Sequence, residues 1–434
     1  MSDILLENKF SNLKAIFLYS IVSFFLFFEM AIQVSPGVMA TQLMHDLNIG
    51  TFGLGFMSGV YFYTYTAMQI PSGFLFDKYS PRIITTFAIL ICMFGTLLFS
   101  FAHTIFLGSV AHLLMGTGSA FAFVAVLVVT ADLFKPKYFA VMTGITQMLA
   151  ALGAMAGQMP ISLLQDYVGW RCTLWILVLI GAILTITIWK LLKYEKKGPI
   201  HKSIQPTTNS LKTIMSNSQT WYIALYACLL WAPMSSFASL WGVPFLTSVD
   251  HIKQTTAAFL CSLMWLGLAI SSPLLGMLSI AINNKVLFLY ITALIGAISF
   301  GLILGYHFSL VSLGILLFLA GAACSGQMLS FTLVKENNPS SVKATAIAFN
   351  NMAVVISGAV FQPLIGKLIE SNSPGLASID NSSHFQQGLC LILGAYVVAF
   401  IISICFITVR PEKTAEELSR RILNNLTNNN EALP

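Results

Sequence analysis

Twelve long apolar segments divide this chain of 434 residues and constrain its fold more than any other feature. A helix that crosses the hydrocarbon core of a membrane needs about 20 mostly apolar residues. Every segment reaches this length, and several are long enough to tilt or kink. The segments span residues 13–40, 51–76, 83–102, 105–133, 138–164, 171–191, 219–247, 254–280, 286–306, 308–334, 344–369 and 386–409. We therefore expect an all-α membrane protein with twelve transmembrane helices.

The composition indicates that lipid surrounds most of the chain. It is 57% hydrophobic and 9% charged, whereas soluble domains average about 25% charged residues. The net charge of +6 is positive, but the basic residues do not gather with aromatic residues on one polar face. The seven cysteines are scattered singly and lack the spacing of a zinc site or a disulfide framework. We expect no nucleic-acid partner, no metal site and no cofactor.

The lysines and arginines predict how the chain is oriented. Basic residues concentrate in the cytoplasmic connections of membrane proteins. If both termini are cytoplasmic, only three of the 22 lysines and arginines face outside, and these are Arg171, Lys253 and Lys367. A wrong number of segments would scramble this alternation, so the distribution supports twelve spans with both termini in the cytoplasm.

A basic polar connection divides the segments six and six. The predicted parts are a first six-helix bundle at 1–191, a cytoplasmic linker at 192–218, a second six-helix bundle at 219–409 and a cytoplasmic tail at 410–434.

The two halves also look weakly related in sequence. An offset of 203 residues places Gly73 on Gly276 and Arg82 on Lys285. Parallel repeats of this kind place a binding site between them near the middle of the membrane.

The stretch "GFLFDKYSPRII" at 73–84 places an acid and two bases between the second and third segments. It resembles the loop signature G-x-L-x-D-[RK]-x-G-R-[RK] of the major facilitator superfamily. The matching residues are Gly73, Leu75, Asp77, Lys78 and Arg82, whereas Ser80 and Pro81 depart from the pattern. The stretches "YFYTYTAMQIPSG" and "GWR" also resemble a branch of bacterial phagosomal nutrient carriers that is similar to lysosomal dipeptide carriers. The resemblance implies a monomeric transporter of a bacterial inner membrane, built from two pseudo-symmetric six-helix bundles.

In that family the matching aspartate lies against the start of the eleventh helix, and the matching base pairs with an acid that ends the fourth. The resemblance therefore implies that Asp77 faces residues 341–345 and that Arg82 pairs with Asp132. Such contacts would hold the halves together on the cytoplasmic side. We predict a cytoplasmic gate formed by Gly73, Asp77, Lys78, Arg82 and Asp132. The alternative is a solvated loop whose charges only set the topology.

Two ionisable residues lie deep within the segments, Glu29 in the first and His112 in the fourth. A charge in the membrane interior costs at least about 2.5–3.5 kcal/mol on insertion scales, so such residues usually have a function. We predict that Glu29 exchanges a proton and that His112 tunes it or contacts the cargo. The alternative is a structural role, with Glu29 bonded to Gln33 and His112 packed as a neutral ring.

Polar and aromatic residues in both halves are candidates for the wall of a cargo cavity. They are Gln33, Tyr61, Tyr65, Gln147, Tyr226, Trp231, Ser235, Gln327, Asn350 and Asn351. Each of these residues alone could equally serve helix packing.

We expect a secondary transporter that works by alternating access and takes up a small polar nutrient, an amino acid or a dipeptide, together with protons. Two alternatives remain open. One is proton-driven export of a drug or siderophore, and the other is a membrane sensor that binds a nutrient without moving it. The chain shows no constellation of nucleophile and base, so we do not expect an enzyme.

Overall fold

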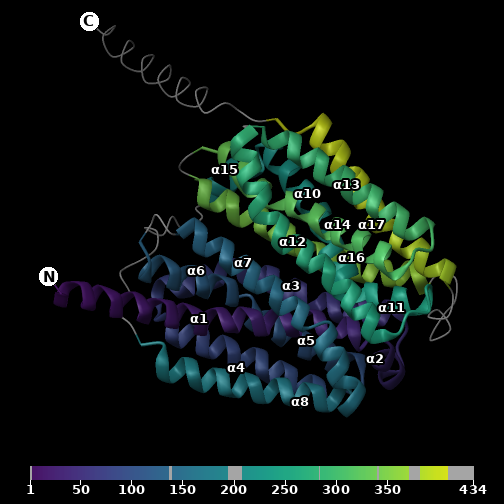
Figure 1. Cartoon of the computed structure of the whole chain (residues 1–434), viewed down its shortest axis with the longest axis horizontal. Helices are drawn as coiled ribbons and strands as arrows, with labels where there is room; N and C mark the ends of the chain where they lie inside the picture. The colour runs from purple at the N-terminus through teal and green to yellow at the C-terminus, as the bar shows by residue number, and fades with distance from the viewer. Residues whose placement is uncertain are drawn as a thin grey trace, which may run out of the picture.

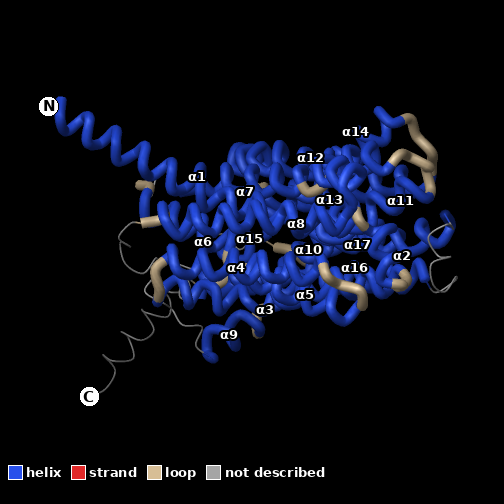
Figure 2. Tube along the Cα trace, turned by 90° about the horizontal axis from the view of Figure 1, so that it is seen from below, coloured by secondary structure: helices blue, strands red, loops and turns tan. Residues whose placement is uncertain are grey.

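Helices account for almost all of the structure. The computed structural model describes residues 2–135, 139–193, 208–282, 284–339, 342–370 and 382–408, and this part of the chain contains no strand (Figure 2). The helices of the first half are α1 (Ser2–Val38), α2 (Ala40–Leu47), α3 (Thr51–Lys78), α4 (Pro81–Ser100), α5 (Ile105–Ser119), α6 (Ala122–Leu133), α7 (Phe139–Ala156) and α8 (Met159–Leu191). Those that follow are α9 (Thr208–Met215), α10 (Ser218–Ala232), the π-helix η2 (Pro233–Trp241), α11 (Gly242–Ser248), α12 (Gln254–Ile282), α13 (Lys285–Gly305), α14 (Leu310–Ala323), the 3₁₀ turn η3 (Cys324–Gly326), α15 (Gln327–Glu336), α16 (Lys343–Glu370) and α17 (Ser382–Cys405).

All twelve predicted segments are helical, but some boundaries differ from the prediction. The predicted fifth segment, 138–164, is divided, because α7 ends at Ala156 and α8 begins at Met159. The predicted break between the fifth and sixth segments is present inside α8, where the backbone at Gly169 is not helical (φ 78°, ψ 162°) and two helices meet at a kink. A glycine tolerates this left-handed conformation because it has no side chain.

By length and hydropathy, ten stretches of the described chain can cross a membrane. One of them, Met142–Leu191, contains most of the predicted fifth segment and all of the sixth. The helix α3 is long enough but is not among the ten. Its threonines, serines, tyrosines and glutamine lower its hydropathy. The predicted linker 192–218 lies partly outside the described residues, and the tail 410–434 lies wholly outside them.

The helix α4 shows how the chain meets lipid. Its exposed side chains Ile83, Phe87, Leu90 and Phe94 recur at helical spacing and form one apolar stripe. Its opposite face is buried against α5 and α8. A large apolar stripe that faces outwards is expected when the surrounding solvent is hydrocarbon.

The seventh segment is not a continuous α-helix. Proline lacks a backbone N–H and clashes with the preceding helical turn, and the π-helix η2 begins at Pro233. Every residue of η2 is buried. This stretch therefore presents its backbone to neighbouring helices rather than to lipid.

The two halves lie side by side, the first in purple to teal and the second in teal-green to yellow (Figure 1). The helix α3 packs along α16, and α7 packs along α12. The N-terminus lies at one end of the molecule, whereas α2 and α11 lie at the other (Figure 1). We call this second end the α2 end.

Candidate functional site

A cavity of about 110 Å³ lies between the halves. Its wall is formed by α1, α3, α6 and α7 of the first half and by α10, α12, α15 and α16 of the second. Six of the ten predicted cavity residues line it, and these are Gln33, Tyr65, Gln147, Trp231, Gln327 and Asn351.

The wall of this cavity combines mostly apolar side chains with a few polar ones. Four of the lining side chains are carboxamides, and no charged side chain is present among the described lining residues. Trp231 meets Trp265 edge to face, with ring centres 6.3 Å apart. The indole nitrogen of Trp265 is buried and has no hydrogen-bond partner in the described part of the chain. Trp265 was not predicted from the sequence, because tryptophan in an apolar segment gives no sign of the face on which it lies.

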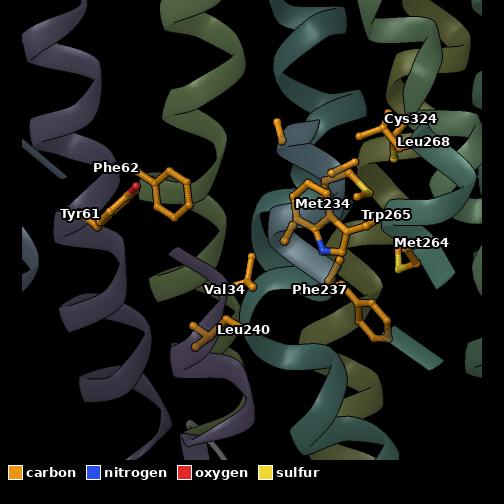
Figure 3. Packing of buried hydrophobic residues seen from close by; sticks show 14 of the residues in the cluster. Val34, Tyr61, Phe62, Met234, Phe237, Leu240, Met264, Trp265, Leu268 and Cys324 are labelled. Atoms are coloured by element: carbon orange, nitrogen blue, oxygen red, sulfur yellow. The ribbon is translucent and has the colours of Figure 1, made fainter. Parts of the chain in front are cut away.

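The C-terminal half packs densely behind this wall. Figure 3 shows Trp265 of α12 extending towards Met234 of η2, with Phe237 and Leu268 nearby. The ring centres of Phe237 and Phe300 lie 5.1 Å apart in an edge-to-face arrangement. Because these side chains fix the α10–η2 segment against α12, they position both tryptophans at the cavity.

The other four predicted cavity residues do not line the cavity. Tyr226 donates a hydrogen bond to the carbonyl of Leu289 at 3.0 Å. The hydroxyls of Ser235 and Ser357 are 2.8 Å apart.

The remaining two also have partners within their own half. The Asn350 amide donates to the hydroxyl of Ser330 at 2.8 Å, and the Tyr61 hydroxyl donates to the Glu29 carboxyl at 2.6 Å. The sequence alone could not show that these four residues lie outside the cavity, because it does not reveal how each helix is rotated about its own axis.

Glu29 and His112 are both buried, but they have separate partners. Nδ1 of His112 donates to the carbonyl of Gly108 at 2.9 Å, because a carbonyl can only accept. Its ring packs edge to face against Phe99, with centres 4.6 Å apart. No hydrogen bond or ion pair joins Glu29 to His112 in the described structure, and the bond between Glu29 and Gln33 that the structural alternative requires is not formed there.

The predicted cytoplasmic gate is described only in part. The side chain of Asp77 and residues 340–341 lie outside the described part of the structure, so the contact predicted for Asp77 stays a prediction. A side chain added at Gly73 would meet no atom of the described residues within 4 Å. Lys78 ends α3, with its amine 5.3 Å from the ring centre of Tyr79.

The guanidinium carbon of Arg82 lies 4.1 Å from the ring centre of Trp189, and Asp132 is buried near the end of α6. In the second half, Lys285 at the start of α13 forms an ion pair with Glu336 at the end of α15. The offset of 203 residues places Arg82 on Lys285. The pair in the second half therefore has the arrangement predicted for Arg82 and Asp132 in the first.

Hydrogen bonds between the halves concentrate at the α2 end. The Gln158 amide donates to the carbonyl of Ala238 in η2, and the Gln254 amide donates to the carbonyl of Val38. The first residues of α3 also bond to α16.

The Thr51 hydroxyl donates to the carbonyl of Gly366 at 2.8 Å, and the Phe52 N–H donates to the Glu370 carboxylate at 2.8 Å. The two halves are therefore joined at this end. The sequence did not predict these contacts, because glutamine and backbone groups can find partners in many places.

A second, wider cavity of about 810 Å³ lies at the α2 end and is lined by residues of α2, α8, α11 and α12. Asp46 lies in its wall and accepts a hydrogen bond from the Trp170 indole at 2.9 Å. This bond lowers the pKa of Asp46, because it favours the charged form. Asp46 therefore favours its ionised form at this end of the molecule.

Comparisons with known proteins agree with this architecture. Residues 19–362 match the model of the Major Facilitator Superfamily. Over 172 residues, 40% of this chain and 39% of the relative, the chain is 27% identical to YybO, an uncharacterized transporter of Bacillus subtilis. Over 139 residues, 32% of each chain, it is 26% identical to SauU, a probable sulfoacetate transporter of Cupriavidus necator. The matched part is thus less than half of either relative.

Solved structures show the same fold. One is an inward-facing, unoccupied bacterial homologue of the human lysosomal transporter Spinster, with a TM-score of 0.75, 15% identity, and coverage of 90% of this chain and 96% of that one. Another is a mutant of the nucleoside transporter NupG, with a TM-score of 0.75, 15% identity, and coverage of 90% and 100%. Since the family model matches well over half of the sequence, the chain belongs to the Major Facilitator Superfamily and is a membrane transporter rather than an enzyme.

Proposed function

We propose that this transporter takes up a small polar nutrient with no net charge, an amino acid or a dipeptide, together with protons. The observation that supports this cargo is the uncharged wall of the cavity between the halves, in which four carboxamides lie among apolar side chains. A carboxamide both donates and accepts hydrogen bonds, so Gln33, Gln147, Gln327 and Asn351 can serve the ammonium and carboxylate ends of a zwitterion. A dianion such as sulfoacetate would find no cationic side chain in the described wall.

Proton coupling is assigned to Glu29. It is the acid buried deepest within the first half, and one of its carboxyl oxygens has no hydrogen-bond partner in the described structure. A buried acid that can be neutral or charged in different states of the carrier is a suitable proton site. His112 does not contact it and is assigned a structural role in holding α5 against α4.

The orientation follows the distribution of basic residues. With both termini in the cytoplasm of a bacterial cell, the α2 end faces outside, and the bonds between the halves close the outer side. The proposed transport unit is a monomer, because the two halves that enclose the cavity belong to the same chain.

Proteoliposomes that contain the purified full chain test this proposal. We expect counterflow of a labelled amino acid or dipeptide, and accumulation against its gradient when a pH difference is imposed. Glu29→Gln should retain exchange of the cargo but lose this accumulation, because exchange does not require release of the proton. Asp166→Asn, at an exposed acid of α8, should behave as the wild type.

The same assay separates the alternatives. Efflux of a preloaded dye without nutrient uptake would support an exporter, and binding of nutrient without flux would support a sensor. Wild-type accumulation by Glu29→Gln would show that the proton follows another route.

A further inference from the structure

Glu29 lies behind the wall of the cavity rather than in it. On α1, Leu26, Met30 and Gln33 line the cavity, and their spacing of four and three residues places them on one face of the helix. Glu29 precedes Met30 by one residue, which is a rotation of about 100° around the helix axis. Its side chain therefore faces α3 and is fully buried there.

Tyr61 of α3 holds one oxygen of this carboxyl. Its hydroxyl donates to Oε1 of Glu29 at 2.6 Å, whereas Oε2 has no partner in the described structure. The backbone of Tyr61 is tightly enclosed, since any side chain at Gly116 of α5 would clash with the Tyr61 carbonyl oxygen. The hydroxyl is thus a donor aimed at the carboxyl from a firmly held segment. Figure 3 shows Tyr61 beside Phe62, which lines the cavity.

A second tyrosine connects Tyr61 with the cavity. The rings of Tyr61 and Tyr65 are stacked with centres 6.0 Å apart, and Tyr65 lines the cavity. The Tyr65 hydroxyl interacts with the side chain of Gln69. Gln69 accepts a hydrogen bond at 3.0 Å from Asn351, a cavity residue of the second half. A continuous line of contacts therefore runs from Glu29 along α3 to α16 in the second half of the molecule.

We propose that Tyr61 is the positioning residue of the proton site and that Tyr61 and Tyr65 together connect the Glu29 carboxyl to the cargo cavity and to α16. This inference rests on the proposed role of Glu29. When Glu29 releases its proton, the Tyr61 hydroxyl is the donor that stabilises the carboxylate in a nonpolar interior. Since α3 also packs along α16, a change in the Tyr61–Glu29 bond acts on the contact between the halves.

The titratable groups that face Glu29 are few. They are Tyr61 and Tyr65 of α3 and Cys92 of α4, whose thiol lies 3.6 Å from the hydroxyl of Ser119. All are neutral at physiological pH in their ordinary state. We therefore assign the pH response of the site to protonation of Glu29. The hydrogen bond from Tyr61 sets the pH at which this protonation takes place.

The test compares Tyr61→Phe, which removes only the hydroxyl, with Tyr63→Phe, at an exposed tyrosine on the same helix. Cargo exchange in proteoliposomes and proton-driven accumulation are measured across a range of pH. For Tyr61→Phe we expect exchange within about twofold of wild type and an accumulation profile moved to higher pH by about one unit, because the carboxylate loses a donor. Tyr63→Phe should match the wild type in both assays.

Two further variants make the result specific. Glu29→Asp keeps the carboxyl on a shorter side chain, which moves it away from the Tyr61 hydroxyl. It should therefore move the pH profile of accumulation in the same direction as Tyr61→Phe. The double variant Glu29→Gln, Tyr61→Phe should behave as Glu29→Gln alone, because Tyr61 acts through the carboxyl. Retained exchange shows in each case that the protein is folded.

The outcomes for Glu29 and for Tyr61 are distinguishable. If Glu29→Gln accumulates cargo as well as the wild type, the proposed coupling fails whatever Tyr61→Phe does. If Glu29→Gln abolishes accumulation but Tyr61→Phe has the wild-type profile and extent, the role of Tyr61 is overturned and the role of Glu29 stands.

Discussion

Asn350 and Asn351 are neighbours in α16 with different surroundings. Asn351 lines the cavity and bonds to Gln69, whereas Asn350 is fully buried and bonds to Ser330 within its own half. Loss of a buried hydrogen-bond partner costs about 1–3 kcal/mol. We therefore expect Asn351→Ala to weaken cargo binding by roughly 5- to 150-fold, measured by equilibrium binding to the detergent-solubilised carrier.

Asn350→Ala is the matched comparison at this scale. It should lower the thermal unfolding temperature while leaving the affinity of the remaining folded protein close to wild type. The opposite pattern, with weak binding in Asn350→Ala and normal binding in Asn351→Ala, would mean that the cargo does not occupy this cavity.

The helices α3 and α16 approach closely because glycines lie at their contact. A side chain added at Gly55 would clash with the Gln362 carbonyl, and one at Gly366 would clash with the Thr51 carbonyl. Small residues allow such backbone approach in membranes, and overpacking costs about 1–3 kcal/mol. We expect Gly366→Ala to hinder closure of the α2 end and to slow transport. Gly394→Ala in α17, where a side chain would meet no described atom within 4 Å, should have no effect. Normal flux in Gly366→Ala would show that this contact is not part of the transport cycle.

At the scale of the whole molecule, the state of the carrier depends on the bonds that join its halves. Removal of the Gln158 and Glu370 side chains deletes two of these bonds. Each hydrogen bond contributes about 0.5–1.5 kcal/mol, so the double alanine variant should favour an open α2 end by roughly 5- to 150-fold. Spin labels at Thr41 of α2 and Ser248 of α11, in opposite halves, should then report longer distances.

Labelling requires a background in which the exposed native cysteines are replaced. These are Cys172, Cys390 and Cys405. Gln386→Ala, which removes a bond to Leu304 within the second half, is the control and should leave the distances unchanged. An unchanged distance in the double variant would show that other contacts hold the α2 end closed.

The sequence by itself determined the class of protein and the order of its apolar helical segments. Each apolar segment is a local property, and in lipid a helix satisfies its own backbone hydrogen bonds regardless of its neighbours. The segments, the division into halves and the family therefore followed from local patterns such as 13–40 and 73–84. The equivalence of Arg82 and Lys285 was also visible as an offset between the halves.

Only the tertiary structure decided which face of each helix meets which neighbour. Polar residues such as Tyr61 and Tyr65 lie one turn apart on α3, yet one holds Glu29 and the other lines the cavity. The break before Met159 and the π-helix at Pro233 rotate the segments that follow them. The rotation of a helix about its axis is set by packing at small residues and by partners far away in the chain, and no local pattern contains that information.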